Sequence, residues 1–227
     1  MMAAEISRMI DVSCVQAQST LDEIAQSIAM AKRFPVAAVF VLPSHVPYAL
    51  ELAGGADIVI GATAGFPSGS ASTATKTQEV AQQRKLGCRE FDMVNNITWL
   101  KAGKDDLYRQ DIAAVVAEAQ GMPVKVILEC HYLSDAEIVR ACNLAVEAGA
   151  AFVKTATGWA PTGATLENIK LIKQTVGDRC SVKAAGGVRG LETILAMHRL
   201  GATRFGISVK AARSILEGLS TSTGSDY

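Results

Sequence analysis

Two lysines occur near the ends of short apolar runs, where lysine is unexpected. Lys154 lies in the run AFVKTATG at 151–158, and Lys183 lies in SVKAAGG at 181–187. Both runs combine β-branched or aromatic residues with a closing glycine, which is typical of a buried strand. Lysine is almost never fully buried unless it has a partner or a chemical task. We therefore predict that these two side chains take part in chemistry.

The spacing of the two lysines favours an amine nucleophile. They are about thirty residues apart, the length of one strand–helix unit, so we expect them on neighbouring strands. Each ammonium would then lower the pKa of the other, leaving one amine neutral and nucleophilic near pH 7. An enzyme that forms a Schiff base needs this arrangement.

Strand-like runs recur along the whole chain with helical patterns between them. We expect strands near 8–14, 36–42, 57–63, 89–95, 123–129, 151–156, 180–185 and 203–207. The segments 20–33, 73–86, 135–148 and 165–176 have apolar residues at the three-and-four spacing of helices, with Ser134 and Thr165 as caps. Eight such units predict an α/β fold, a single (β/α)8 TIM barrel. A doubly wound open sheet is second, because no Gly-x-Gly-x-x-Gly opening is present.

Four consecutive expected strands carry a charge that would face the barrel interior. These charges are Asp92, Lys125, Lys154 and Lys183, and Glu90 shares the parity of Asp92. A satisfied ion network in the barrel core is one interpretation. Catalysis is the other, because barrel active sites lie at the carboxyl ends of the strands. The surplus of lysines over acids suits a depressed amine pKa and an anionic substrate.

The loops after the seventh and eighth expected strands are rich in small residues. They read GGVRG at 186–190 and GIS at 206–208, each before an expected helix. Backbone N–H groups at such positions bind anions, and these loops often hold phosphate in TIM barrels. We therefore expect a phosphate site there.

The composition narrows the function classes. The chain has 227 residues, 49% of them hydrophobic, and a formal net charge of zero. This balance gives no support for nucleic-acid binding, and no apolar stretch approaches the roughly 18 residues of a membrane span. No secretory signal pattern is visible, so we expect a cytoplasmic protein. We expect one barrel domain over 1–219 and a flexible tail over 220–227.

Cysteine and histidine usage argues against metal and disulfide chemistry. The five cysteines are odd in number and form no C-x-x-C pair, and a three-histidine metal centre would need every histidine in the chain. Cys130 and His131 are adjacent, but neighbouring strand residues point to opposite faces. We therefore interpret Cys130 as a buried thiol and expect no metal.

At its lysine motifs the chain resembles the 2-deoxy-D-ribose-5-phosphate aldolase family of class I aldolases. FVKTATG at 152–158 is similar to the family's Schiff-base strand, and VKAAGGVR at 182–189 to its second-lysine strand and phosphate loop. EFDMVNN at 90–96 and VKVILE at 124–129 resemble its fourth and fifth strands, and GFP at 65–67 with Gly69 also fits. The resemblance runs from about residue 8 to the C-terminus. It implies a (β/α)8 barrel and reversible cleavage of 2-deoxyribose 5-phosphate to acetaldehyde and glyceraldehyde 3-phosphate.

The resemblance also implies roles for individual residues. Lys154 would form the imine, Lys183 would lower its pKa, Asp92 would move protons through a bound water, and Lys125 would orient Asp92. The terminal Tyr227 matches a tyrosine implicated in proton transfer. The residues implied in substrate binding are Asp11, Thr155, Thr157, Gly158, Gly186, Gly187, Gly206 and Ser208. No cofactor is implied, because the imine is the electron sink. The expected partner is a small phosphorylated aldehyde or sugar, and a homo-oligomer such as a dimer is left open.

Three departures from the family pattern keep other functions open. The first strand reads Asp11-Val12-Ser13-Cys14 where the family has Asp-His-Thr-Leu, Phe40 replaces a cysteine, and Ile207 precedes Ser208 in the last phosphate loop. The same imine mechanism on another phosphorylated sugar is therefore an alternative. A phosphate-binding barrel that uses its lysines only as charges is a third hypothesis.

Overall fold

The barrel expected from the sequence is present. The computed structural model describes residues 2–222, and its eight strands form a closed parallel barrel in the order of the chain. The strands are β1 Ile10–Cys14, β2 Ala38–Val41, β3 Ile60–Ala64, β4 Glu90–Val94, β5 Val124–Ile127, β6 Phe152–Lys154, β7 Ser181–Ala185 and β8 Arg204–Ser208. Pairing of β1 with β8 closes the sheet.

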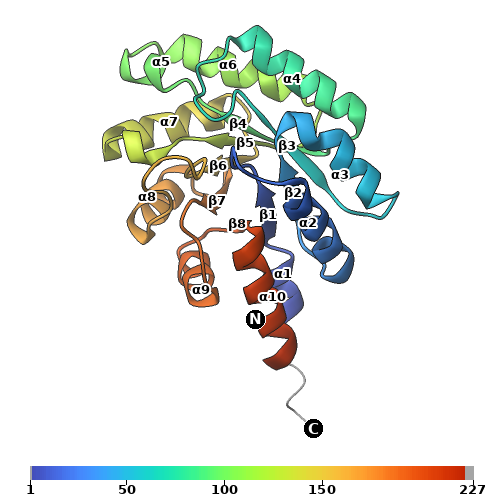
Figure 1. Ribbon diagram of the computed structural model, residues 1–227. Helices are drawn as coiled ribbons and strands as arrows, with labels where there is room; N and C mark the ends of the chain where they lie inside the picture. Colours follow the sequence, from blue (N-terminus) through green and yellow to red (C-terminus); the bar gives the residue numbers. More distant parts are fainter. Residues whose placement is uncertain (1, 223–227) are drawn as a thin grey trace.

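Helices surround the barrel on its outside (Figure 1). They are α1 Ala3–Ser7, α2 Leu21–Arg33, α3 Val46–Ala53, α4 Thr73–Leu86, α5 Ile97–Lys101, α6 Asp105–Glu118, α7 Asp135–Glu147, α8 Leu166–Val176, α9 Leu191–Arg199 and α10 Val209–Ser222, with 3-10 turns η1 Pro43–His45 and η2 Cys130–Tyr132. Ser134 and Thr165 accept hydrogen bonds from the third residue of α7 and α8, as the sequence predicts for caps.

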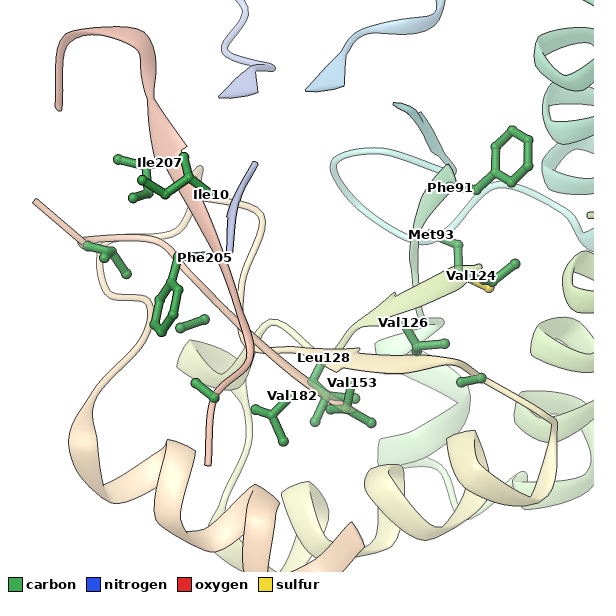
Figure 2. Close-up of a cluster of buried hydrophobic side chains, with 14 of the residues drawn as sticks. Ile10, Phe91, Met93, Val124, Val126, Leu128, Val153, Val182, Phe205 and Ile207 are labelled. Atoms are coloured by element: carbon green, nitrogen blue, oxygen red, sulfur yellow. The ribbon is translucent and has the colours of Figure 1, made fainter. Parts of the chain in front are cut away.

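Alternation along the strands separates an apolar outer face from an inward face that carries the buried charges together with Phe40. Phe91 and Met93 of β4, and Val124 and Val126 of β5, belong to the apolar cluster between barrel and helices (Figure 2). The residues between them therefore point to the barrel axis, since successive strand side chains face opposite ways. This parity brings Glu90, Asp92 and the equivalent residues of the other strands together inside the barrel.

The chain ends differ in one respect from the expected domain division. Helix α10 extends to Ser222 and includes the first three residues of the segment expected as a tail. Residues 223–227, with the predicted catalytic Tyr227, lie outside the described residues. Within the described range no helix has the length and apolar character needed to cross a membrane.

Candidate active site

The barrel interior holds a connected cluster of charged side chains. Its acids are Asp11, Glu90 and Asp92, and its bases are Lys125, Lys154, Lys183 and Arg204. All seven come from the inward positions of β1, β4, β5, β6, β7 and β8. The cluster therefore includes the four charges expected from the sequence together with Glu90, and it adds Asp11 and Arg204 to them.

Asp92 joins the two lysines of the sequence motifs. Its Oδ2 accepts a hydrogen bond from Lys154 Nζ at 2.7 Å and another from Lys183 Nζ at 2.7 Å. Its Oδ1 is buried and accepts no hydrogen bond from the described residues, and Lys125 Nζ lies 3.7 Å from it. One oxygen thus orients both lysines, while the other lies within ion-pair distance of Lys125 and accepts no hydrogen bond from the described residues.

Lys154 is the member of the cluster that reaches the cavity at the barrel mouth. It borders that cavity, and 3% of its surface is exposed. Burial lowers the pKa of its amine to about 8, and the charge of Lys183 adds to this effect against the opposing effect of Asp92. The neutral amine that a nucleophile requires is therefore a minor species at neutral pH, but a far larger one than for a lysine of ordinary pKa.

Lys183 behaves differently from the sequence expectation. We expected the two lysines to lower each other's pKa, but only the effect on Lys154 is present. Burial alone would lower the pKa of Lys183, yet the carboxylates of Asp11 and Asp92 outweigh it and raise that pKa. Lys183 Nζ lies 2.7 Å from Asp11 Oδ2 as well as from Asp92. Lys183 therefore remains a cation whose charge acts on Lys154.

Lys125 belongs to the part of the cluster formed by Glu90, Arg204 and Asp11. Its ammonium donates to Glu90 Oε2, and Arg204 bridges that carboxylate to Asp11. The distance to Asp92 is longer, so Lys125 acts on Asp92 through its charge rather than through a direct hydrogen bond. The sequence offered no motif for Arg204, which stands alone at the beginning of β8.

A cavity of about 470 Å³ opens at the carboxyl ends of β6, β7 and β8. The predicted site residues that border it are Lys154, Thr157, Gly158, Gly186, Gly187, Gly206 and Ser208. Asp11, Asp92, Lys125, Thr155 and Lys183 do not border it and lie deeper in the barrel wall and interior. Arg189 of the expected phosphate loop also borders it, as do residues not expected from the sequence, among them Ser13, Gln16, Thr162 and Thr165.

Two of the predicted anion-binding glycines have a packing reason as well. Gly186 has φ +82° and approaches Gly163 so closely that a Cβ would lie 2.9 Å from the Gly163 Cα. This contact docks the loop after β6 onto the end of β7, where Ala164 N–H donates to Gly186 O. A Cβ on Gly206 would lie 3.4 Å from Lys183 Cε. It would lie closer still, 3.1 Å, to the Cβ of Ala185, so Gly206 allows the close approach of β7 and β8.

The loop that follows Lys154 is fixed by Glu129, which had no expected role, and by Thr155 and Thr157, which were expected in substrate binding. Glu129 adopts the left-handed region with φ 56°, which is uncommon for a residue other than glycine. Its buried carboxylate accepts hydrogen bonds from the N–H and hydroxyl of Thr157. Thr155 exchanges hydrogen bonds with the backbone of Ala185 on β7. Both threonines therefore hold the strand end that carries Lys154.

The three departures from the family pattern occupy different environments. Val12 and Ile207 belong to the apolar cluster outside the barrel, although Ile207 also borders the cavity. Phe40 points inward, where it packs with Val15 and Ala38. Of these three positions, Phe40 is the one whose side chain meets the charged cluster.

The cysteines are buried thiols. Cys130 lies in η2 rather than on a strand, and burial raises the pKa of its thiol to about 12. His131 Nδ1 instead pairs with Thr162 Oγ1 at 2.7 Å. Among residues 2–222, no group of three or more histidine, cysteine, aspartate or glutamate side chains is placed to hold a metal ion.

Comparison with known proteins gives consistent results across sequence and structure. The family model described as DeoC/LacD family aldolase matches residues 4–214. A deoxyribose-phosphate aldolase of Staphylococcus epidermidis is 45% identical over 221 residues, covering 97% of this chain and 99% of that protein.

Two solved structures have similar folds. The aldolase QR15 has a TM-score of 0.91 and 32% identity, covering 98% of this chain and 99% of its own. A deoxyribose phosphate aldolase from Aeropyrum pernix, described as having a unique tetrameric structure, has a TM-score of 0.88 and 22% identity, covering 96% of this chain and 92% of its own. At 22% identity this likeness shows a shared fold and nothing further.

Proposed function

Because this chain belongs to the DeoC/LacD family of aldolases, we propose that it reversibly cleaves 2-deoxy-D-ribose 5-phosphate to acetaldehyde and D-glyceraldehyde 3-phosphate through a Schiff base. The observation that carries the proposal is Lys154, a buried amine of lowered pKa at the edge of a cavity and in contact with Asp92. An amine in that position can attack a carbonyl group held in the cavity.

Lys154 supplies the nucleophile and the electron sink. Its neutral amine adds to the aldehyde carbon of the open-chain sugar, and loss of water gives a protonated imine. The C2–C3 bond then breaks, its electron pair moves into the imine, and the enamine of acetaldehyde remains on Lys154. Protonation of the enamine carbon and addition of water release acetaldehyde and regenerate the amine. The imine performs the electron withdrawal, so the mechanism uses no cofactor.

Asp92 provides the base for the bond cleavage. The C3 hydroxyl must lose its proton as the C2–C3 bond breaks, and an ionised carboxylate such as Asp92 can receive that proton through one water. Burial opposes the ionised form of Asp92, but Lys154 and Lys183 outweigh it and lower the pKa. Lys125 adds to the same effect and keeps Asp92 ionised.

The phosphate would bind at the ends of β7 and β8. Gly186, Gly187 and Ser208 border the cavity there, and α9 begins after Gly190 without a side-chain cap. Uncapped N–H groups at a helix start favour an anion. Arg189, which also borders the cavity, adds a positive charge near this end.

Replacing Gly187 tests the phosphate position. We expect Gly187→Asp to raise KM for the phosphorylated sugar roughly 10- to 100-fold over Gly187→Asn, because a carboxylate near a phosphate is repelled. A Cβ at Gly187 would meet no neighbouring atom, but the positive φ of +89° strains the backbone of any residue other than glycine. The Asn variant shares the strain and the shape, and equal KM values in both variants would place the phosphate elsewhere.

Replacing Lys183 tests its effect on Lys154. Lys183→Met removes a charge that lowers the Lys154 pKa, so the acidic limb of the turnover profile should move to higher pH. Activity should then recover in part at alkaline pH, and thermal unfolding checks that the variant is folded. A loss of constant size across the whole pH range would instead assign Lys183 a direct proton-transfer or structural role.

A different phosphorylated sugar is the second candidate, and Ile207 favours it, because this departure from the family pattern borders the cavity. Borohydride trapping followed by peptide mapping separates the candidates. An acetaldehyde adduct on Lys154 supports the first, and trapping with larger carbonyl compounds alone supports the second. No adduct at all supports a phosphate-binding barrel without imine chemistry. A panel of phosphorylated aldehydes incubated with acetaldehyde then identifies the acceptor.

The remaining proposals concern the location of the protein in the cell, its oligomeric state and the role of Tyr227. We propose a cytoplasmic protein that forms a homo-oligomer such as a dimer, which light scattering on the purified chain tests. Tyr227, outside the described residues, is proposed to exchange protons at the enamine carbon. Deuterium incorporation from solvent into acetaldehyde, with and without Tyr227, tests that role.

A further inference from the structure

The ring of Phe40 faces the buried ammonium groups of two lysines. The ring centroid lies 4.0 Å from Lys183 Nζ and 4.5 Å from Lys125 Nζ. Phe40 is 1% exposed, and both lysines are fully buried. An aromatic face attracts a cation at this range, and the attraction is stronger where the cation is removed from water.

The neighbouring strand is adapted to this ring. A Cβ on Gly61 of β3 would lie 2.4 Å from Phe40 Cζ, so only glycine fits beside the ring as it stands. Phe40 and Gly61 are paired in register on β2 and β3. The ring of Phe40 on β2 therefore fills the space that Gly61 on β3 leaves free.

The ring completes the surroundings of the Lys183 ammonium. An ammonium has three N–H donors. One donates to Asp92, a second faces Asp11 at 2.7 Å, and the Phe40 ring lies against the same nitrogen. Lys183 is thus enclosed by two carboxylates and an aromatic face, whereas Lys154 has Asp92 on one side and the cavity on the other.

We propose that Phe40 is a positioning residue that acts through Lys183: its ring holds Lys183 as a cation turned toward Asp11 and Asp92, so that the imine forms on Lys154. The proposal rests on the Schiff-base function proposed above. It predicts that turnover falls at alkaline pH as Lys183 loses its proton, and that the ring sets where this fall occurs.

Other charged groups also act on the protonation of Lys183, and the experiment must separate their effects from the effect of the ring. Asp11 and Asp92 favour the charged form of Lys183, Lys125 opposes it, and Arg204 and Glu90 act through Asp11 and Lys125. A change confined to the electron density of the Phe40 ring leaves the carboxylates and Arg204 unaltered, but it also acts on Lys125, whose ammonium lies 4.5 Å from the ring. Fluorinated phenylalanines make such a change, because fluorine weakens the negative face while nearly keeping the shape.

The experiment installs mono-, di- and trifluorophenylalanine at position 40 by site-specific incorporation and measures turnover against pH. We expect the alkaline limb to move stepwise to lower pH, by about one pH unit in total, with the acidic limb of Lys154 nearly unchanged. A limb that stays in place through the series overturns the proposal.

Phe152 provides a matched control. Its ring lies 5.5 Å from Lys125 Nζ and 5.7 Å from the Arg204 guanidinium, and among the described residues its ring forms no cation–π pair with Lys183. Fluorination at position 152 should leave the alkaline limb in place. An equal shift from both positions would assign the limb to Lys125 and overturn the proposal.

Two further measurements keep the outcomes distinct. Gly61→Ala should lose stability in the parent and recover part of it with Phe40→Leu, and an unchanged Tm for Gly61→Ala would mean that the ring lies elsewhere. Borohydride trapping of acetaldehyde on Lys154 in the parent tests the proposed function itself. If acetaldehyde is trapped but the alkaline limb does not move, only the role of Phe40 is rejected. If no acetaldehyde is trapped, the Schiff-base function itself is rejected.

Discussion

Lys154→Arg should reduce turnover by at least about a thousandfold, equivalent to more than ~4 kcal/mol of transition-state stabilisation. Arginine keeps the positive charge and much of the length, but its guanidinium stays protonated and cannot form an imine. The contact with Asp92 can persist, because a guanidinium also donates to a carboxylate. The expected loss therefore isolates the amine chemistry from the electrostatics of the cluster.

The measurement combines turnover with borohydride trapping of acetaldehyde. The variant should give no adduct on the peptide that contains position 154, while the parent gives one. Lys170→Arg is a suitable control, since Lys170 is an exposed lysine on α8 and should keep full activity. Near-normal turnover of Lys154→Arg would exclude the Schiff-base mechanism.

The convergence of the charged residues could be predicted from the sequence because strand parity is a local property. Asp92, Lys125, Lys154 and Lys183 each lie on a short apolar run, and parallel strands in a closed barrel must direct alternate residues to one axis. The fold and the central group of the site follow from that rule together with the recurrence of strand–helix units.

The partners within the cluster could not be predicted in the same way. Arg204 and Asp11 meet across the closure between β8 and β1, residues at opposite ends of the chain, and no local pattern marks that contact. Their presence changes the electrostatics, because Asp11 helps to raise the pKa of Lys183. The sequence argument counted the lysines as mutually repelling and placed Asp11 among the substrate-binding residues instead.

Backbone conformation was a second feature that could not be predicted from the sequence. Glu129 ends its strand in the left-handed region and turns its carboxylate toward Thr157, which neither residue type nor spacing suggests. The fit of Phe40 against Gly61 likewise depends on the register of two strands rather than on either residue alone. Such pairs are visible only when the strands are placed side by side.

Asp92→Asn should separate imine formation from bond cleavage. Asparagine nearly preserves the shape of the side chain but cannot take a proton, so we expect turnover of the phosphorylated sugar to fall by about 10²- to 10⁴-fold. The carboxylate also raises the Lys154 pKa against burial and Lys183. Its removal should therefore lower that pKa, and acetaldehyde trapping on Lys154 should extend to lower pH than in the parent.

Stability must be distinguished from catalysis in this variant, because Asp92 is buried among lysines. Asp111 is a matched control: its carboxylate is also buried and lies 2.6 Å from the ammonium of Lys76, in a pair outside the barrel interior. Breaking a buried ion pair costs about 3 kcal/mol or more, so both Asn variants should lose stability. Only Asp92→Asn should lose turnover and shift the pH range of trapping. If trapping and turnover were lost in parallel, Asp92 would serve to place Lys154 rather than to accept the proton of the C3 hydroxyl.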